Sequence, residues 1–422
     1  MDDEMMGLDT LIERKKGHRY ATFRDKSGKE ARIQLKELLV RQRAVVCRRT
    51  TFYRTRNGHV AKLSWASDKR KPEAEHLELA AARGVEGGAR VEAYHQITTI
   101  TDMRKGLTFE EASSHDIAPI NSKDTPAADS ESINRLSLKR KSSSDGTSRS
   151  KRSRSNSQKS KLIHQVDKLL SNDKAKSSPY TSTPEDTFEN RIYSCLVVSR
   201  AGRVIGKFTS IKELLEALRD AIRAHESLYT VGNIVHSDIS SNNIIITDEK
   251  APDGFRGMLI DLDLAKVRDT DPSGARHQTG TMQFMAIEVL QQANHTYRHD
   301  LESFFYVLLW VCARCSWVNW FGGKEVPPRD SILRKWEVGS FEDIARVKEY
   351  YMSVRGTKEV MDGFPETFDI VKSLCLRIRK ILFPLDEDEG INIGTPAESP
   401  DQLHNAIVAA YEKTIHRLSN DC

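Results

Sequence analysis

A segment rich in serine, lysine and arginine interrupts the chain and limits where a folded core can form. Residues 113–185 include the run LKRKSSSDGTSRSKRSRSNSQKS and are nearly free of aromatic side chains. Such a segment buries too little apolar surface to offset the entropy lost on ordering its backbone, so we expect it to be disordered. The core must therefore be built from the residues on either side of it.

The positive charge of the chain is concentrated in this segment. The 422 residues carry a net charge of +5, from 65 basic and 60 acidic side chains. Residues 139–154 hold seven basic residues and one acidic residue, and 7 − 1 gives +6, so the rest of the chain is close to neutral. A nucleic-acid-binding fold is therefore not indicated. The clusters KRK and KRSR resemble a two-part nuclear import signal, which would bind an import receptor; the alternative is a solvated linker.

The remaining sequence predicts a soluble protein of the nucleus, the cytoplasm or both, without membrane contact. Its longest apolar run, FFYVLLWVC at Phe304–Cys312, is much shorter than the ~20 residues that span a bilayer. We expect it to form a buried core helix. The N-terminal MDDEMMGLDT does not have the pattern of a signal peptide. The pair Cys312 and Cys315 has apolar neighbours, which favours two buried thiols over a zinc site.

Local patterns predict a hairpin and two helices. In TFYRTRNGHVAKLSW, β-branched and aromatic residues flank Asn57-Gly58, a strong turn signal. KPEAEHLELAAARG then has proline at its start, good helix formers and a closing glycine. After the basic segment, SIKELLEALRDAIRAHESLY has the spacing of an amphipathic helix, with Ser210 and Glu213 as a capping box. His225 on its apolar face is expected to be a packed core residue.

The stretch HSDISSNNIII, from His236 to Ile246, carries groups suited to phosphoryl transfer. That reaction needs positioning and charge neutralisation more than covalent chemistry. Asp238 could accept a hydroxyl proton, and Asn243, five residues later, could hold magnesium, which prefers oxygen ligands. Asp261 follows in the apolar run MLIDLDLAK, where a carboxylate is costly unless it binds something. Taken alone, however, these residues are better explained as hydrogen-bonded turns before two short strands.

Taken together, several motifs resemble those of protein kinases. The residues from His236 to Asn243 are similar to the catalytic loop HRDxxxxN, and Asp261-Leu262-Asp263 is similar to DFG. Ala286-Ile287-Glu288 in GTMQFMAIEVL resembles APE, and RHDLESFFYVLLW places an aspartate before a buried helix, as kinases do. Four stretches closely resemble the sequences of the fungal-type protein kinase family: HSDISSNNIII, LIDLDLAK, TGTMQFMAIEVL and TYRHDLESFFYVLLW. The resemblance extends from near Thr50 to about Trp320.

This resemblance implies an α+β, bilobal kinase-like fold. Residues 1–112 would form an N-terminal extension and a small β-rich lobe, 113–185 a disordered basic insert, and 186–422 the hinge and a large, mainly helical lobe. It also implies ATP and Mg²⁺ as cofactors and protein Ser/Thr hydroxyls as acceptors. Asp238 would be the base, and Asn243 and Asp261 would bind the metal. His236 and Thr281 are expected to brace the catalytic loop, and Glu288 to form a buried ion pair with an arginine.

Kinases also need a strand lysine that contacts the phosphates and a helical glutamate that pairs with it. Lys62 in HVAKLSW is the best lysine, and Glu73 in EAEHL is the best glutamate, because Leu77 one turn later would face the core. Glu75 is a rival that spacing alone does not exclude. Ordinary surface charges are the alternative explanation for all three.

The departures from the kinase pattern keep other functions open. A GxGxxG loop does not precede Lys62, where CRRTTFYRTRNG stands instead. Ser237 replaces the usual arginine, Ser240 the usual lysine, and Asp263 the glycine of DFG. One alternative is therefore a pseudokinase scaffold that binds partners without turnover. Another is a small-molecule phosphotransferase of the aminoglycoside or choline kinase type, although those enzymes lack the APE-like segment.

Overall fold

The chain divides into two units, and nearly all of the described structure belongs to the first. The computed structural model describes residues 12–24, 30–41, 50–106, 190–247, 254–268, 280–317, 320–321, 324–325, 327–328, 331–385, 390–396 and 399–420. The first unit comprises Met1–Arg104 and Asn190–Cys422, and the second comprises Lys105–Glu189. The predicted disorder of residues 113–185 and the predicted import signal at 139–154 lie outside the described residues.

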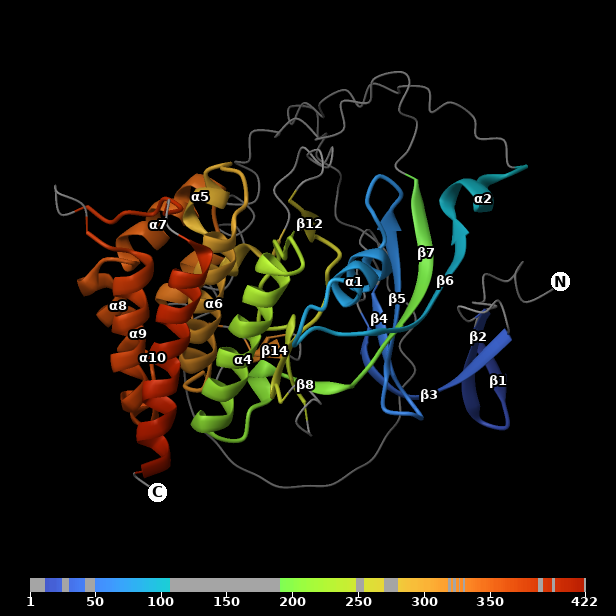
Figure 1. Ribbon diagram of the computed structural model, residues 1–422, viewed down its shortest axis with the longest axis horizontal. Coiled ribbons are helices and arrows are strands. Elements are labelled where there is room, and N and C mark those ends of the chain that lie inside the picture. Colours follow the sequence, from blue (N-terminus) through green and yellow to red (C-terminus); the bar gives the residue numbers. More distant parts are fainter. Residues whose placement is uncertain are drawn as a thin grey trace, which may run out of the picture. The chain divides into compact units, whose positions relative to one another are not determined.

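In the N-terminal part of the first unit, seven described strands form one antiparallel sheet in the order β1-β2-β3-β4-β5-β7-β6 (Figure 1). They are β1 (Ile12–Lys15), β2 (His18–Arg24), β3 (Glu30–Arg41), β4 (Thr51–Thr55), β5 (Val60–Ser67), β6 (Val91–Thr99) and β7 (Arg191–Val198). The predicted hairpin is confirmed, since β4 pairs with β5 and Gly58 in the turn has a φ of +79°, which glycine adopts without strain. β5 also pairs with β7 along its whole length, although the basic segment separates them in the sequence. Lys62 on β5 is therefore flanked by a strand on each side.

The first predicted helix is present as α1 (Glu73–Ala82). Pro72 occupies its N-cap position, and Gly84, just beyond its end, has a φ of +83°. Ala74, Leu77 and Ala80 are buried in a cluster with residues of β7, β10 and β11. This packing fixes the first turn of α1, and with it Glu73, close to the sheet.

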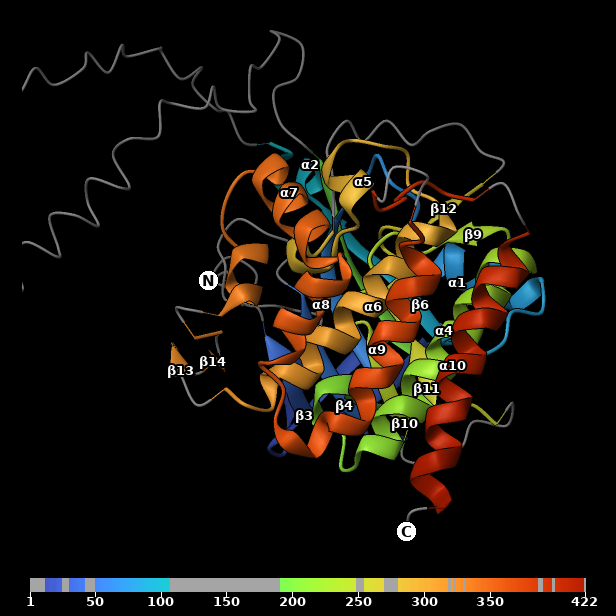
Figure 2. The ribbon, with the colours of Figure 1, turned by 90° about the vertical axis from the view of Figure 1, so that its left-hand side faces the viewer.

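The C-terminal part of the first unit is mainly helical, as predicted. Its helices are α4 (Ile211–Thr230), α5 (Ile287–Leu290), α6 (Tyr297–Arg314), α7 (Phe341–Tyr351), α8 (Val354–Met361), α9 (Asp369–Leu382) and α10 (Pro400–Asn420). The apolar run in α6 is buried from Tyr297 to Ala313, which confirms a core helix. Figure 2 shows α10 running alongside α4 and α9, and these helices contact one another. A single apolar cluster joins all of these helices.

The N-terminus of α4 is capped largely as the sequence predicts. The Ser210 side chain accepts a hydrogen bond from Glu213 N at 3.1 Å. The Glu213 carboxylate bonds to Thr209 N at 2.6 Å, one residue before the cap, and also pairs with Arg203. These bonds hold the pKa of Glu213 at about 2, mainly through Arg203. The cap therefore fixes the point at which the chain enters the helical part.

A three-stranded sheet and a two-stranded sheet carry the stretches that the sequence singled out. β10 (Ile244–Thr247) pairs with β11 (Gly257–Leu259) and with β8 (Gly202–Val204), and β9 (Ile234–Val235) pairs with β12 (Lys266–Val267). β11 lies so close to α4 that a Cβ at Gly257 would meet Ala217 O at 1.9 Å, which only glycine avoids. The predicted pair of short strands is thus confirmed. Asp238 and Asn243 lie between β9 and β10, and Asp261 lies just after β11.

The described part of the chain is a mixed α/β structure, with its large sheet in the N-terminal part and most of its helices in the C-terminal part. Among the described helices, none is both long enough and apolar enough to cross a membrane. The thiol prediction was half wrong. Cys312 is buried inside α6, but Cys315 is exposed because it is the C-cap residue, where the helix leaves the core.

Candidate functional site

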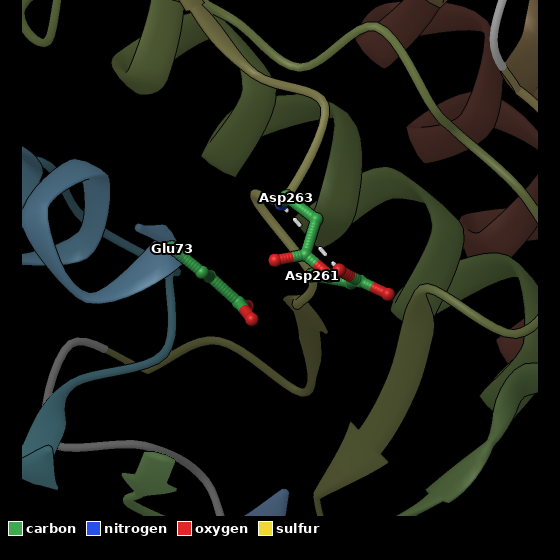
Figure 3. Close-up of side chains that lie close together, drawn as sticks. All are labelled: Glu73, Asp261 and Asp263. Carbon is green, nitrogen blue, oxygen red and sulfur yellow. Dashed lines mark hydrogen bonds between the residues drawn. The ribbon is translucent and has the colours of Figure 1, made fainter. Parts of the chain in front are cut away.

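Lys62 joins the sheet to the helical part through three carboxylates. Its Nζ donates to Glu73 Oε2 at 2.6 Å and to Asp261 Oδ1 and Asp263 Oδ2 at 2.8 Å each. An ammonium group has three protons, so these contacts use all of them. Figure 3 shows the three carboxylates, one from α1 and two from the segment after β11, converging on one region. We call Lys62, Glu73, Asp261 and Asp263 the lysine cluster.

The contact with Lys62 distinguishes Glu73 from its rival. Glu73 is buried in the first turn of α1, and its second oxygen, Oε1, accepts a hydrogen bond from Leu262 N at 3.1 Å. Glu75 is exposed on the opposite side of the same turn. Glu73 therefore links β5, α1 and the segment after β11, as the sequence pattern favoured.

The lysine cluster holds more negative charge than one ammonium neutralises. Burial opposes the charge of Lys62, but the fields of Asp261, Glu73 and Asp263 outweigh it and raise its pKa well above the ordinary value. Burial raises the pKa of Glu73 to about 7, and the neighbouring aspartates add to this against the field of Lys62. The ammonium is therefore firmly protonated.

Asp238 and Asn243 face each other across the loop between β9 and β10. Asn243 Nδ2 donates to Asp238 O at 2.8 Å and lies 3.3 Å from Asp238 Oδ2. Thr281 donates to Asp238 Oδ1 through both its backbone N and its Oγ1, at 3.1 Å each. Burial and the charge of Asp261 raise the pKa of Asp238. The loop thus holds one half-buried carboxylate in a fixed orientation with enhanced basicity.

Two residues of the site have strained backbones. Ser237 has a φ of 65° and Asp261 a φ of 68°, in the left-handed region that side-chain-bearing residues rarely adopt. Such strain persists where the surroundings fix the conformation, often at functional sites. At Ser237 the conformation is fixed by a hydrogen bond, which the backbone N donates to Asp300 Oδ1 at 3.1 Å.

Asp300, in the first turn of α6, anchors the stretch that begins at His236. Its carboxylate accepts from the backbone N of His236 at 3.1 Å and from that of Ser237, and from His225 Nε2 at 3.0 Å and His295 Nε2 at 2.8 Å. Burial opposes ionisation, but the fields and hydrogen bonds of His295 and His225 lower the pKa of Asp300 well below its ordinary value. The Asp300 carboxylate is therefore ionised, and both of its oxygens accept hydrogen bonds.

A histidine pair extends this anchor to α10. His404 Nδ1 faces Pro400 O at 2.8 Å, so it must donate, and burial lowers the pKa of His404 to about 3, so the ring is neutral. Its Nε2 therefore accepts from His225 Nδ1 at 2.9 Å. The other nitrogen of His225 faces the Asp300 carboxylate at 3.0 Å, so His225 links Asp300 to His404. As predicted, His225 is a packed core residue.

One predicted ion pair is wrong. Among the described residues, the partner of Glu288 is a histidine and not an arginine: Glu288 accepts from His299 Nε2 at 2.8 Å and remains partly exposed. The buried carboxylate–arginine pair is formed instead within α6, between Glu302 and Arg298, and Glu302 also accepts from Ile287 N at 2.7 Å. The pair at i and i+4 forms because one helical turn brings its two members together.

His236 and Thr281 lie where the resemblance predicts bracing residues. His236 Nδ1 accepts from Asp238 N at 3.3 Å, and its Nε2 contacts Ile260 O at 3.2 Å. The sequence reasoning overlooked Asp263 as a partner of Lys62, and His295 and His404 as part of the Asp300 anchor. The position of Asp263 in an apolar run was a signal, whereas nothing local in the sequence marked the two histidines.

The donor set suits a divalent cation and a nucleotide. Asn243 turns its amide nitrogen toward Asp238, so its oxygen is the end of the side chain that can bind a cation. Asp261 contributes a carboxylate from a cluster whose oxygens lie within 4.8 Å of one another. Carboxylate and amide oxygens are the ligands that Mg²⁺ prefers. Lys62 supplies a firmly protonated ammonium beside them, which is suited to phosphate oxygens.

Comparison with known proteins gives one match. No curated protein matches the chain. The family model described as fungal protein kinase, however, matches residues 1–312, which include the sheet, the lysine cluster, the Asp238 loop, Asp300 and most of α6. Because this match covers well over half of its length, the chain belongs to the fungal protein kinase family.

Proposed function

We propose that this chain is a protein kinase that transfers the γ-phosphate of ATP to Ser or Thr hydroxyls, with Mg²⁺. The observation that carries the proposal is that Lys62 contacts both Glu73 and Asp261, at 2.6 and 2.8 Å, across the junction between sheet and helical part. A strand lysine held by a helical glutamate beside a metal-binding aspartate is the arrangement that phosphoryl transfer requires. In this proposal, residues 1–112 and 186–422 supply the two lobes and residues 113–185 are an insert.

Asp238 acts as the base. Its Oδ1 is held by Thr281, which orients the carboxylate, and its raised pKa increases its affinity for a proton. The hydroxyl oxygen of the substrate forms a bond to the γ-phosphorus while the bond from that phosphorus to the bridging oxygen breaks. Asp238 takes the hydroxyl proton, and ADP leaves with the electron pair of the broken bond.

Lys62, Asn243 and Asp261 position the phosphates. Lys62 offers its ammonium to phosphate oxygens, and Glu73 keeps that ammonium in place. Asn243 and Asp261 provide the oxygens that hold the metal. Bound Mg²⁺ would neutralise charge on the phosphates during the transfer. The stretch before β4, where kinases have the loop that covers the phosphates, includes residues 42–49, which lie outside the described residues.

A protein substrate is favoured over a small molecule by the segment after Thr281. η2 (Met282–Phe284) and α5 carry the APE-like residues, and Lys348 of α7 donates to Met285 O at 2.6 Å. This bond fixes a ledge beside Asp238 on which an extended peptide could lie. Small-molecule phosphotransferases of the aminoglycoside or choline kinase type lack such a segment, which is why the ledge supports the proposal.

The test is transfer of labelled γ-phosphate from ATP and Mg²⁺ to the protein itself and to a panel of protein substrates. Asp238→Asn keeps the shape of the side chain but cannot take the proton, so we expect a loss of about 10²–10⁴-fold in rate. Asp102→Asn, on the exposed side of α2 (Ile100–Arg104), is the matched control and should leave the rate unchanged. Identification of the phosphorylated amino acid then tests the Ser/Thr assignment.

Three results would change the conclusion. Phosphate incorporation that persists in Asp238→Asn would reject this residue as the base. ATP binding without transfer by the unaltered protein would favour a scaffold. Transfer to aminoglycosides or choline, with none to proteins, would favour the small-molecule phosphotransferase.

A further inference from the structure

Asp263 is the member of the lysine cluster to which the proposed function gives no role. It stands where the kinase pattern has the glycine of DFG. Its Oδ2 accepts a hydrogen bond from Lys62 Nζ at 2.8 Å, the same length as the bond that Lys62 Nζ donates to Asp261 Oδ1. Only 12% of its side chain is exposed. Together with Lys62 and Glu73 it lines a pocket bounded by β5, β7 and the start of α1. A carboxylate in this place alters what the site can bind.

The first consequence concerns hydrogen bonds. Lys62 has three ammonium protons, and Glu73, Asp261 and Asp263 each take one. A phosphate oxygen can therefore reach Lys62 only if one carboxylate gives up its bond. Glu73 is also tied to Leu262 N, and Asp263 is less exposed than Asp261, 12% against 23%, so Asp261 is the freest of the three to move. Asp261 is the partner that a cation would draw off.

The second consequence concerns charge. The cluster carries a net charge of −2 when Glu73 is ionised and −1 when Glu73 is protonated, and its carboxylate oxygens lie within 4.8 Å of one another. A nucleotide without metal brings further negative charge to this place. A divalent cation brings +2, which offsets the excess. With a glycine in place of Asp263 the cluster would carry one negative charge fewer.

We propose that Asp263 makes nucleotide binding at this site conditional on a divalent cation. The inference rests on the proposed function, because it assumes that ATP binds at Lys62. In this view Asp263 keeps Lys62 saturated and repels phosphates until a cation engages Asp261 and frees one ammonium proton. Asp263 is thus a specificity-determining residue that discriminates metal-bound from metal-free nucleotide.

The test measures binding of ATP to the full-length protein by calorimetry, once with excess Mg²⁺ and once with EDTA. The ratio of the two dissociation constants, metal-free over metal-bound, is the metal coupling. We expect Asp263→Asn, which keeps the shape and removes one charge, to reduce this ratio about tenfold or more, chiefly by tightening metal-free binding. Asp263→Gly removes the carboxylate altogether and should change the ratio in the same direction.

The control is Glu75→Gln, which removes a carboxylate from the exposed side of the same turn of α1 that carries Glu73. It should leave the metal coupling as in the unaltered protein. A ratio that is unchanged in both Asp263 variants would overturn the inference, as would equal binding with and without Mg²⁺ in the unaltered protein. Failure of the unaltered protein to bind ATP under either condition would instead overturn the proposed function on which the inference depends.

Discussion

Replacing Lys348 by methionine tests whether burial lowers the pKa of the side chain that donates to Met285 O. Lys348 on α7 is fully buried, and its Nζ donates to Met285 O at 2.6 Å. Its Nζ also lies 3.4 Å from Met282 O, 4.3 Å from the Tyr306 ring centroid and 5.4 Å from that of Trp336. Burial lowers its pKa from 10.5 to about 7, against the field of Glu302.

The expected change in the free energy of unfolding with pH follows from proton linkage. Between about pH 7 and 10 the unfolded chain carries a proton on Lys348 and the native protein does not, so rising pH stabilises the native state relative to the unfolded state. With a native pKa of about 7 and an unfolded pKa of 10.5, this residue should add about 2 kcal/mol to the free energy of unfolding between about pH 7.5 and 9. Lys348→Met has no such proton and should lack this increment.

The assay is urea unfolding of the unaltered protein and of Lys348→Met, each at about pH 7.5 and about pH 9. Other titrating groups, including Glu302 and Tyr306 beside Lys348, are present in both proteins and largely cancel in the comparison. The stability of the unaltered protein relative to the variant should therefore rise by about 2 kcal/mol on going from about pH 7.5 to 9. A stability difference that stays constant over this range would refute the depressed pKa of Lys348.

Three further predictions concern stability. Gly257→Ala should lower the free energy of unfolding in urea by at least about 3 kcal/mol, because the new Cβ would overlap the backbone of Ala217. Glu302→Gln should cost about 3–5 kcal/mol in the same assay, because it leaves the buried guanidinium of Arg298 without its carboxylate. His404→Ala should cost about 1–3 kcal/mol through loss of a buried acceptor, and amide hydrogen exchange should be faster in the loop that Asp300 holds.

Matched controls separate these effects from general sensitivity to substitution. Gly88→Ala places a Cβ where no atom lies within 4 Å, so stability should change by less than about 0.5 kcal/mol. Glu412→Gln breaks an exposed pair with Arg223 and should cost at most about 1 kcal/mol. If a control lost as much stability as its partner variant, the close contact or the burial would not be the cause.

The parts of the fold that the sequence predicted are those that depend on nearby residues. The Asn57-Gly58 turn, the start of α4 at Ser210 and the buried run of α6 each follow from residues within a few positions of one another. Such signals reflect local backbone preference and the spacing of apolar side chains. They were sufficient to place Asp238 and Asn243 in a loop before a strand.

Contacts between distant residues were predicted only where a family pattern supplied them. The contact of Thr281 with Asp238 spans 43 positions, and the motif resemblance suggested it. The pairing of Lys62 with Asp261 spans 199 positions and was not predicted. The bond between His225 and His404 spans 179 positions, and no pattern marked it. Glu288 was assigned an arginine by analogy, whereas packing placed His299 beside it. Side-chain partners of this kind depend on how helices pack, which local periodicity does not specify.

The two charged centres of the site differ in how far they can rearrange. Asp300 is fully buried, and four N–H groups from three separate parts of the chain use the lone pairs of its carboxylate. Any change there would leave a buried donor unsatisfied, so the loop bearing Asp238 is held rigidly. The lysine cluster is partly exposed at Asp261 and carries excess negative charge, so a cation would lower its energy by drawing a carboxylate away. Under the proposed function, rigidity for proton transfer and adjustability for the nucleotide therefore belong to different carboxylates, and substitutions at Asp300 and at Asp263 should affect different steps.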